Sequence, residues 1–123
     1  MGTDIAEPLA TRKCHPCEGG VQRMSRQQAE AEIPMLSGWR LTHDGLRIEK
    51  HWHMQDFSAG IDLLDRVAEL AESEGHHPDL HLEGYSHVWI ELWTHAVGGL
   101  SENDFILAAK IDQLPARLKA QAL

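Results

Sequence analysis

The chain has 123 residues, of which 42% are hydrophobic and 24% are charged, and its formal net charge is −8. This length suits one domain whose core needs neither disulfides nor metals. The acidic charge disfavours binding to nucleic acid, and because no apolar run could span a membrane and no signal-peptide pattern opens the chain, we expect a cytoplasmic protein.

Residues 1–24 lack a sustained apolar period and contain several prolines and glycines, which predicts a flexible N-terminal arm ahead of a domain over residues 25–123. Cys14 and Cys17 form a Cys-x-x-Cys pair within this arm. No second pair follows at the spacing of a zinc site, and two cysteines are too few for a disulfide scaffold. We interpret the pair as incidental, with redox use or a shared metal as the alternative.

The expected elements begin with a short helix and a hairpin. Ser25 and Gln28 have the spacing of a capping box, and a proline follows about two helical turns later. Apolar residues then alternate over residues 39–52 on both sides of Asp44 and Gly45. Such a pair favours a tight type I′ turn, which predicts a β-hairpin.

Residues 55–75 carry the strongest helical pattern in the chain. Asp56 is placed to cap the start of this helix and Gly75 to end it, so that the helix leads directly to His76. The apolar stripe expected to face the core consists of Phe57, Ile61, Leu64, Ala68 and Ala71.

A second hairpin is expected over residues 79–94, turning near residues 84–86, and a last helix follows it. Ser101 and Asp104 form its capping box, and Pro115 should end or kink it, leaving a short helical tail. The order helix, hairpin, helix, hairpin, helix predicts an α+β two-layer sandwich, a four-stranded antiparallel sheet with helices on one face.

Five histidines fall within residues 74–95. His76 and His77 immediately precede the third predicted strand, and His95 follows the fourth. Because these two strand ends meet at the same edge of an antiparallel sheet, we expect the three imidazoles to lie close together, joined by Asp104. Two further histidines are expected at the surface outside this cluster, His81 and His87.

Each of these residues also has a plainer interpretation. His77 precedes Pro78 and can be a rigid turn residue, Asp104 can be a helix cap, and His95 can simply end a strand. Three histidines and a carboxylate could also hold zinc or iron. Adjacent side chains in an extended segment point in opposite directions, however, so His76 and His77 seldom reach one ion. Acid–base chemistry near neutral pH has no such requirement.

The same residues form a spaced motif: a His-His-Pro-acidic loop after a helix, a Thr-His pair after a hairpin, a Gly-Leu pair, and an early aspartate in the next helix. With an upstream aromatic framework, this combination over residues 25–114 closely resembles the pterin-4a-carbinolamine dehydratases. The residues that carry the resemblance are His76-His77-Pro78-Asp79, Thr94-His95, Gly99-Leu100 and Asp104, with Trp39, Trp52, Asp56, Phe57 and Ala59 upstream.

The resemblance implies dehydration of 4a-hydroxytetrahydropterin to quinonoid dihydropterin and water, in tetrahydrobiopterin-type cofactor recycling, with no metal or organic cofactor. It implies His76, His77 and His95 as catalytic residues, and these three with Pro78 and Asp104 as substrate-binding residues. It further implies a homodimer or homotetramer, and a role in an aromatic amino acid hydroxylase pathway.

Animal members of this family also bind a transcription factor. The alternative function is therefore that of a non-enzymatic interaction protein of the dimerisation or coactivator type. Such a protein would use the apolar stripe of the long helix, including Ile61 and Leu64.

Overall fold

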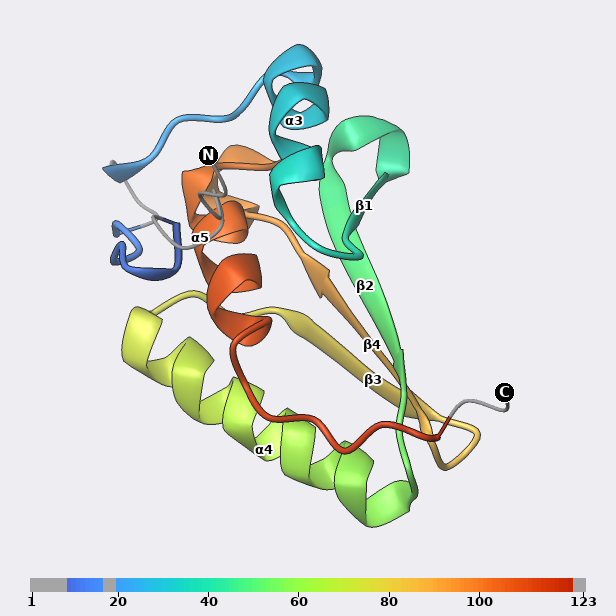
Figure 1. The fold of residues 1–123 in the computed structure, drawn as a ribbon. Helices are drawn as coiled ribbons and strands as arrows, with labels where there is room; N and C mark the ends of the chain where they lie inside the picture. The colour runs from blue at the N-terminus through green and yellow to red at the C-terminus, as the bar shows by residue number, and fades with distance from the viewer. Residues whose placement is uncertain (1–8, 17–19, 121–123) are drawn as a thin grey trace, which may run out of the picture.

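The computed structural model describes residues 9–16 and 20–120, which form an antiparallel sheet covered by helices (Figure 1). The predicted α+β architecture and the predicted order of helices and hairpins are confirmed. The elements are α3 (Arg26–Glu32), β1 (Arg40–Thr42), β2 (Arg47–His53), α4 (Phe57–Glu74), β3 (Asp79–Glu83), β4 (His87–Leu92) and α5 (Glu102–Ile111), with short 3₁₀ turns η1 (Ile33–Met35), η2 (His43–Gly45) and η3 (His95–Val97).

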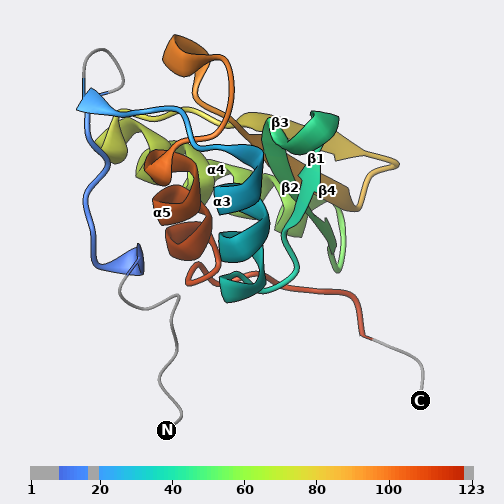
Figure 2. The same ribbon diagram turned by 90° about the horizontal axis from the view of Figure 1, so that it is seen from above.

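The four strands lie in the order β1-β2-β4-β3, so the second hairpin adds to the first through the central pair β2 and β4. Figures 1 and 2 together show the helices on one side of this sheet. Val88, Ile90 and Leu92 face that side and are fully buried, as their alternation predicts. The opposite face of the sheet carries polar and aromatic residues, among them Trp89 and Glu91.

The predicted helix ends are confirmed where capping residues close in sequence determine them. Ser25 and Gln28 form a reciprocal capping box at the start of α3. Asp56 accepts a hydrogen bond from the N–H of Ala59 at 2.8 Å, and Gly75 ends α4 in the left-handed region with φ 67°. These caps fix where α4 begins and where it releases the chain.

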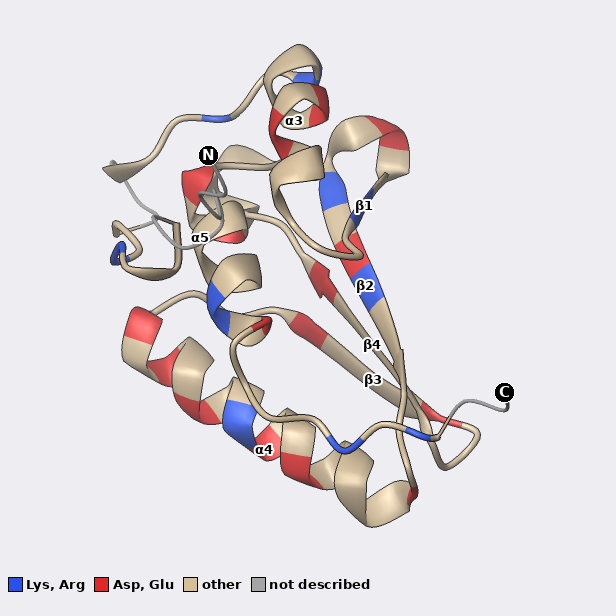
Figure 3. Cartoon of the chain, in the orientation of Figure 1, with Lys and Arg blue, Asp and Glu red and all other residues tan. Residues whose placement is uncertain are grey.

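The predicted buried stripe of α4 is only partly correct: Ala71 is buried and Leu64 packs against the core, but the buried face is rotated by about one residue. Phe57 and Ile61 are 54% and 40% exposed. Gly60 instead lies against the sheet, where an added Cβ would come within 2.9 Å of a Leu82 methyl group. The small and aliphatic residues on the same side of the helix as Gly60 face inward, while Figure 3 shows acidic residues along the exposed side of α4. The residues that α4 buries are Ala59, Gly60, Leu63, Val67, Ala71 and Glu74.

The first hairpin is confirmed, but its turn is not the expected two-residue turn. The last paired residues are Thr42 and Arg47, which leaves a four-residue connection. His43, Asp44 and Gly45 all have positive φ, at 53°, 57° and 82°. Asp44 and Gly45 do supply the left-handed pair that the sequence suggested, within a longer loop.

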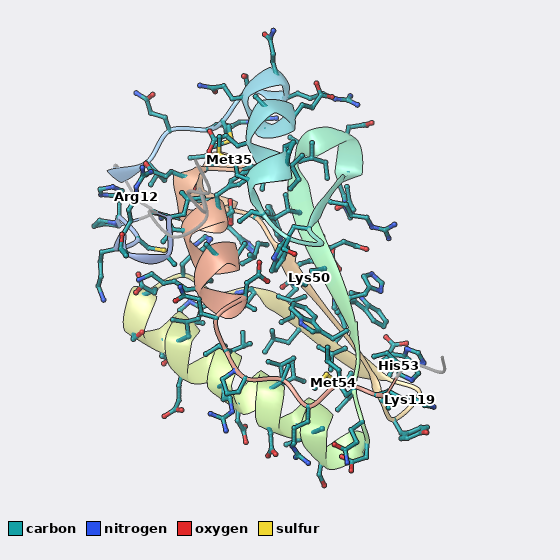
Figure 4. All side chains as sticks on the ribbon, viewed as in Figure 1. Arg12, Met35, Lys50, His53, Met54 and Lys119 are labelled. Atoms are coloured by element: carbon teal, nitrogen blue, oxygen red, sulfur yellow. The ribbon has the colours of Figure 1, made fainter. Side chains whose placement is uncertain are left out.

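The predicted helical tail after α5 is wrong. Residues 115–120 run as an extended segment beside the end of β2, near the labelled residues His53, Met54 and Lys119 in Figure 4. The N–H of Lys119 donates to the carbonyl of His53 at 3.0 Å, and Leu118 bridges Met54. Pro115 disfavours helix at the residue before it, and pairing with β2 then satisfies the backbone.

Part of the predicted N-terminal arm packs on the domain. Leu9 and Cys14 are buried, and the N–H of Met24 donates to the carbonyl of Leu100 at 2.7 Å. Residues 1–8 and 17–19, including Cys17, lie outside the described residues. A domain boundary at residue 24 stays a prediction. None of the helices in the described part of the chain has the length and apolar character of a membrane span.

Candidate active site

The end of α4 and the start of α5 bring His76 and Asp104 together. The N–H of His76 donates to the carbonyl of Ala71 at 3.2 Å, which continues the helix cap at Gly75. His76 is only 4% exposed and Asp104 is 0% exposed. Nε2 of His76 lies 2.6 Å from Oδ1 of Asp104. A carboxylate this close fixes the orientation of the imidazole ring.

The other oxygen of Asp104 is held by the preceding loop. The Ser101 N–H and the Thr94 hydroxyl donate to Oδ2 at 2.9 and 2.8 Å. The Ser101 hydroxyl lies 2.7 Å from the Thr94 hydroxyl and completes the network. Asp104 is therefore both the capping residue of α5 and the partner of His76, so the two interpretations of this residue are compatible.

His95 reaches the same place from the end of β4. Thr94 pairs with Gly99, with its N–H donating to the Gly99 carbonyl at 2.8 Å, and this pairing closes the loop that contains η3. His95 is exposed. Its ring stacks on Trp93, with ring centroids 3.8 Å apart and an interplanar angle of 26°.

The structure brings the three predicted histidines to one cavity. The cavity has a volume of about 230 Å³. Asp104 lies behind His76 and does not line the cavity. Pro78 directly follows His77 in the sequence, and it is not among the lining residues either. The lining residues are Gly75, His76, His77, Trp93, His95 and Ala96.

His77 differs from His76 as the alternation of an extended segment predicts. Its side chain is 62% exposed, and its ring contacts the carboxylate of Glu72. The ion pair is exposed to solvent and is therefore weak. His77 thus lies at the exposed rim of the cavity, whereas the buried His76 forms part of its wall.

The two histidines expected outside the cluster do lie outside it. His81 contacts Glu91 at 3.0 Å and stacks on Trp89, and His87 stacks on His53 with centroids 4.4 Å apart. Both are on the helix-free face of the sheet. Within residues 9–16 and 20–120, no three His, Cys, Asp or Glu side chains form a group that could hold a metal ion.

Behind the cavity lies a set of contacts that sequence reasoning missed. The N-terminal strap (residues 12–16) contacts both α4 and α5 and belongs to the blue segment that lies beside α5 in Figure 1. The N–H of Cys14 donates to Oε1 of Glu74 at 2.8 Å. The backbone of His15 exchanges two hydrogen bonds with the Asn103 side chain, at 2.9 and 2.8 Å. The strap thus holds the residues directly beside the His76–Asp104 pair.

Glu74 is the charged centre of this strap contact. Lys110 donates to its Oε2 at 2.7 Å, and the Lys13 ammonium lies 3.7 Å away. Burial raises the pKa of Glu74, but the Cys14 N–H and the two lysines outweigh that effect and lower the pKa below its ordinary value of 4.5. Burial, assisted by the Glu74 carboxylate, raises the pKa of the Cys14 thiol to about 12.

Comparison with known proteins gives one consistent result. The family model "Pterin 4 alpha carbinolamine dehydratase" matches residues 22–114. The chain is 50% identical over 109 residues to "Pterin-4-alpha-carbinolamine dehydratase 2, mitochondrial" of Arabidopsis thaliana, covering 86% of this chain and 58% of that protein. It is 42% identical over 106 residues to a "Putative pterin-4-alpha-carbinolamine dehydratase" of Azoarcus sp. (strain BH72), covering 86% and 90%.

A solved structure shares the fold. The "transcriptional coactivator/pterin dehydratase" of Brucella melitensis superposes with a TM-score of 0.67 at 27% sequence identity. The match covers 73% of this chain and 95% of the Brucella chain.

Proposed function

Because the chain belongs to the pterin-4a-carbinolamine dehydratase family, we propose that its dehydratase reaction runs by proton transfer through His76 and His95. The activity is that of a 4a-hydroxytetrahydrobiopterin dehydratase. The reaction converts the 4a-carbinolamine into quinonoid dihydropterin and water.

The bond changes define what the site must supply. The C4a–O bond breaks, a proton joins the departing hydroxyl to give water, N5 loses its proton, and a C4a=N5 double bond forms. No electrons enter or leave, so the balance requires no oxidant, reductant or redox cofactor. One group that donates a proton and one that accepts a proton suffice.

His76 is the proposed base. A base becomes cationic when it accepts the N5 proton, and the buried Asp104 carboxylate at 2.6 Å stabilises that cation. Thr94 holds the carboxylate in place, so the stabilisation needs no rearrangement during the reaction. His95, which lines the same cavity and is exposed to solvent, is the proposed acid that protonates the 4a-hydroxyl.

His77 and Pro78 are proposed to bind the substrate rather than transfer protons. His77 lines the cavity at its exposed rim, and Pro78 restricts the backbone of His77 to extended conformations. The cavity is exposed to solvent at His77, which suits a flat ring that carries a variable substituent.

The observation that carries this function is the buried His76–Asp104 pair, whose histidine lines the same cavity as His95. Stopped-flow measurement of 4a-hydroxytetrahydrobiopterin, generated by a pterin-dependent hydroxylase, tests it. We expect a dehydration rate that rises in proportion to the protein concentration, for the wild type and equally for a His81→Ala control. A rate that stays at the uncatalysed value would refute the proposal.

Self-association as a dimer or tetramer is a second proposal. On α4, Phe57 and Ile61 expose apolar surface that association would cover. Light scattering should report a mass that falls in an Ile61→Asp variant. The Brucella relative is described as a "transcriptional coactivator/pterin dehydratase", and the same exposed surface would serve a non-enzymatic interaction role. A protein with only the interaction role would tolerate loss of His76 and His95, whereas a catalyst would lose its activity.

The substrate must come from a reaction that leaves a hydroxyl on C4a, as a pterin-dependent aromatic amino acid hydroxylase does. We propose that this chain follows such a hydroxylase. Two Arabidopsis thaliana relatives are named mitochondrial and chloroplastic, and a cytoplasmic location for this chain stays a prediction.

A further inference from the structure

His95 is oriented differently from His76. His76 is buried and bonded to a carboxylate, whereas His95 is exposed. No side chain in the described part of the chain hydrogen-bonds to the His95 ring; the contact recorded for that ring is its stack on Trp93. An exposed side chain with one flat contact depends on that contact for its rotamer.

Trp93 is itself contacted by residues of two strands, β2 and β3. Its Nε1–H donates to Oδ2 of Asp79 at 3.2 Å, which ties it to the start of β3. The Arg47 guanidinium of β2 lies 4.5 Å from the centroid of the Trp93 ring. Arg47 in turn contacts Glu91 of β4 at 3.4 Å. The indole is therefore a fixed platform just beyond the end of β4.

We propose that Trp93 is a positioning residue that holds the His95 imidazole in the orientation needed for proton transfer. The proposal rests on the function assigned to His95 above. Stacked aromatic pairs at this separation gain energy from contact area and ring electrostatics, and the flat platform excludes most rotamers of the imidazole. Trp93 lines the cavity together with His95, so a change of the indole alters the orientation of His95 within the site itself.

Trp89 provides a matched control. It lies on β4, four residues before Trp93, which directly follows that strand, and it also stacks on histidines. Its partners are His51 and His81, with ring centroids 5.5 and 4.7 Å away. Neither histidine lines the cavity, so loss of Trp89 removes similar packing without touching the proposed acid.

The test compares Trp93→Ala, Trp93→Phe, Trp89→Ala and the wild type. We expect Trp93→Ala to lower kcat about tenfold with KM within about twofold, because the acid is misplaced while the substrate contacts remain. Trp93→Phe keeps an aromatic platform and should retain at least about a third of kcat. Trp89→Ala should leave both constants within about twofold of the wild type.

An NMR measurement tests the contact without any assay of turnover. Ring protons of His95 should show an upfield ring-current shift that Trp93→Ala removes and Trp93→Phe partly retains. If Trp93→Ala raises KM and leaves kcat unchanged, the indole contacts the substrate instead and the proposal is overturned. It is equally overturned if the His95 ring protons do not shift in Trp93→Ala. A wild-type protein without dehydratase activity would refute the proposed function, and these NMR shifts would then decide alone whether Trp93 orients His95.

Discussion

Asp104 and His76 are 28 residues apart in sequence, yet Oδ1 of Asp104 lies 2.6 Å from Nε2 of His76 with both side chains buried. The same carboxylate accepts hydrogen bonds from Ser101 and Thr94 through its other oxygen. One side chain thus joins the end of β4, the start of α5 and the end of α4. The orientation of His76 follows from the capping of a helix.

Replacement of Asp104 by asparagine should lower turnover by about 10²-fold or more. The amide can keep its oxygen toward Ser101 and Thr94 only by turning its nitrogen toward His76. His76 must then accept a hydrogen bond at Nε2, which is the wrong tautomer for a base supported by a carboxylate. Steady-state kinetics of Asp104→Asn check this, with Glu102→Gln as the control for loss of a charge in the same helical turn. Near-normal turnover in Asp104→Asn would contradict the role of the pair.

His77→Ala should raise KM by about three- to tenfold and leave kcat within about twofold, because His77 forms the exposed rim of the cavity. Glu72→Gln removes the ion-pair partner of His77 and should have a smaller effect, since an exposed pair contributes at most about 1 kcal/mol. A fall in kcat in His77→Ala with KM unchanged would place His77 in the proton transfer itself.

The sequence predicts the fold well where the signal is local. The Ser25 cap, the Asp56 cap and the alternation of Val88, Ile90 and Leu92 each involve neighbours along the chain, and each is found as expected. The buried face of α4 is different, because apolar residues lie on two adjacent stripes of that helix. Contact of Gly60 with Leu82 selects between them, and that contact exists only in the folded chain.

Glu74→Gln should destabilise the fold at neutral pH and much less in acid. The pKa of Glu74 is lowered in the folded state, so its carboxylate contributes stability that is present above 4.5 and is lost as the pH falls through the lower folded pKa. Urea unfolding at pH 7 should show a loss of about 1–3 kcal/mol, the usual cost of breaking buried hydrogen bonds to a charged group. The exposed Glu69→Gln variant on the same helix is the control. An equal loss at pH 7 and pH 3 would show that the charge of Glu74 is not what stabilises the strap.

The Cys14 thiol should be unreactive while the protein is folded. Its pKa of about 12 leaves a thiolate fraction on the order of 10⁻⁴ at pH 8, and its side chain is buried. A Cys17→Ser variant isolates Cys14, and Ellman's reagent should label it only after addition of urea. Prompt labelling of the native variant would indicate that the strap opens or that the thiol is activated.

The part of the site that follows from the order and direction of the strands could be predicted from the sequence. The ends of antiparallel strands meet at one edge, which correctly brings His76 and His95 to the same cavity. The Trp93 stack and the strap contacts were not predictable, because they depend on side-chain reach rather than on strand order. Cys14 meets Glu74 across 60 positions and His15 meets Asn103 across 88, and no periodic pattern encodes such contacts.

The most direct test of the central claim is single-turnover dehydration by His76→Ala and His95→Ala, measured beside His81→Ala and His87→Ala. Each of the first two should lower the rate by roughly 10²–10⁴-fold, the usual contribution of one positioned proton-transfer group, while binding of a dihydropterin changes little. The two control variants lie on the helix-free face and should match the wild type. If His76→Ala and His95→Ala each keep more than about half of the wild-type rate, these histidines do not transfer the protons.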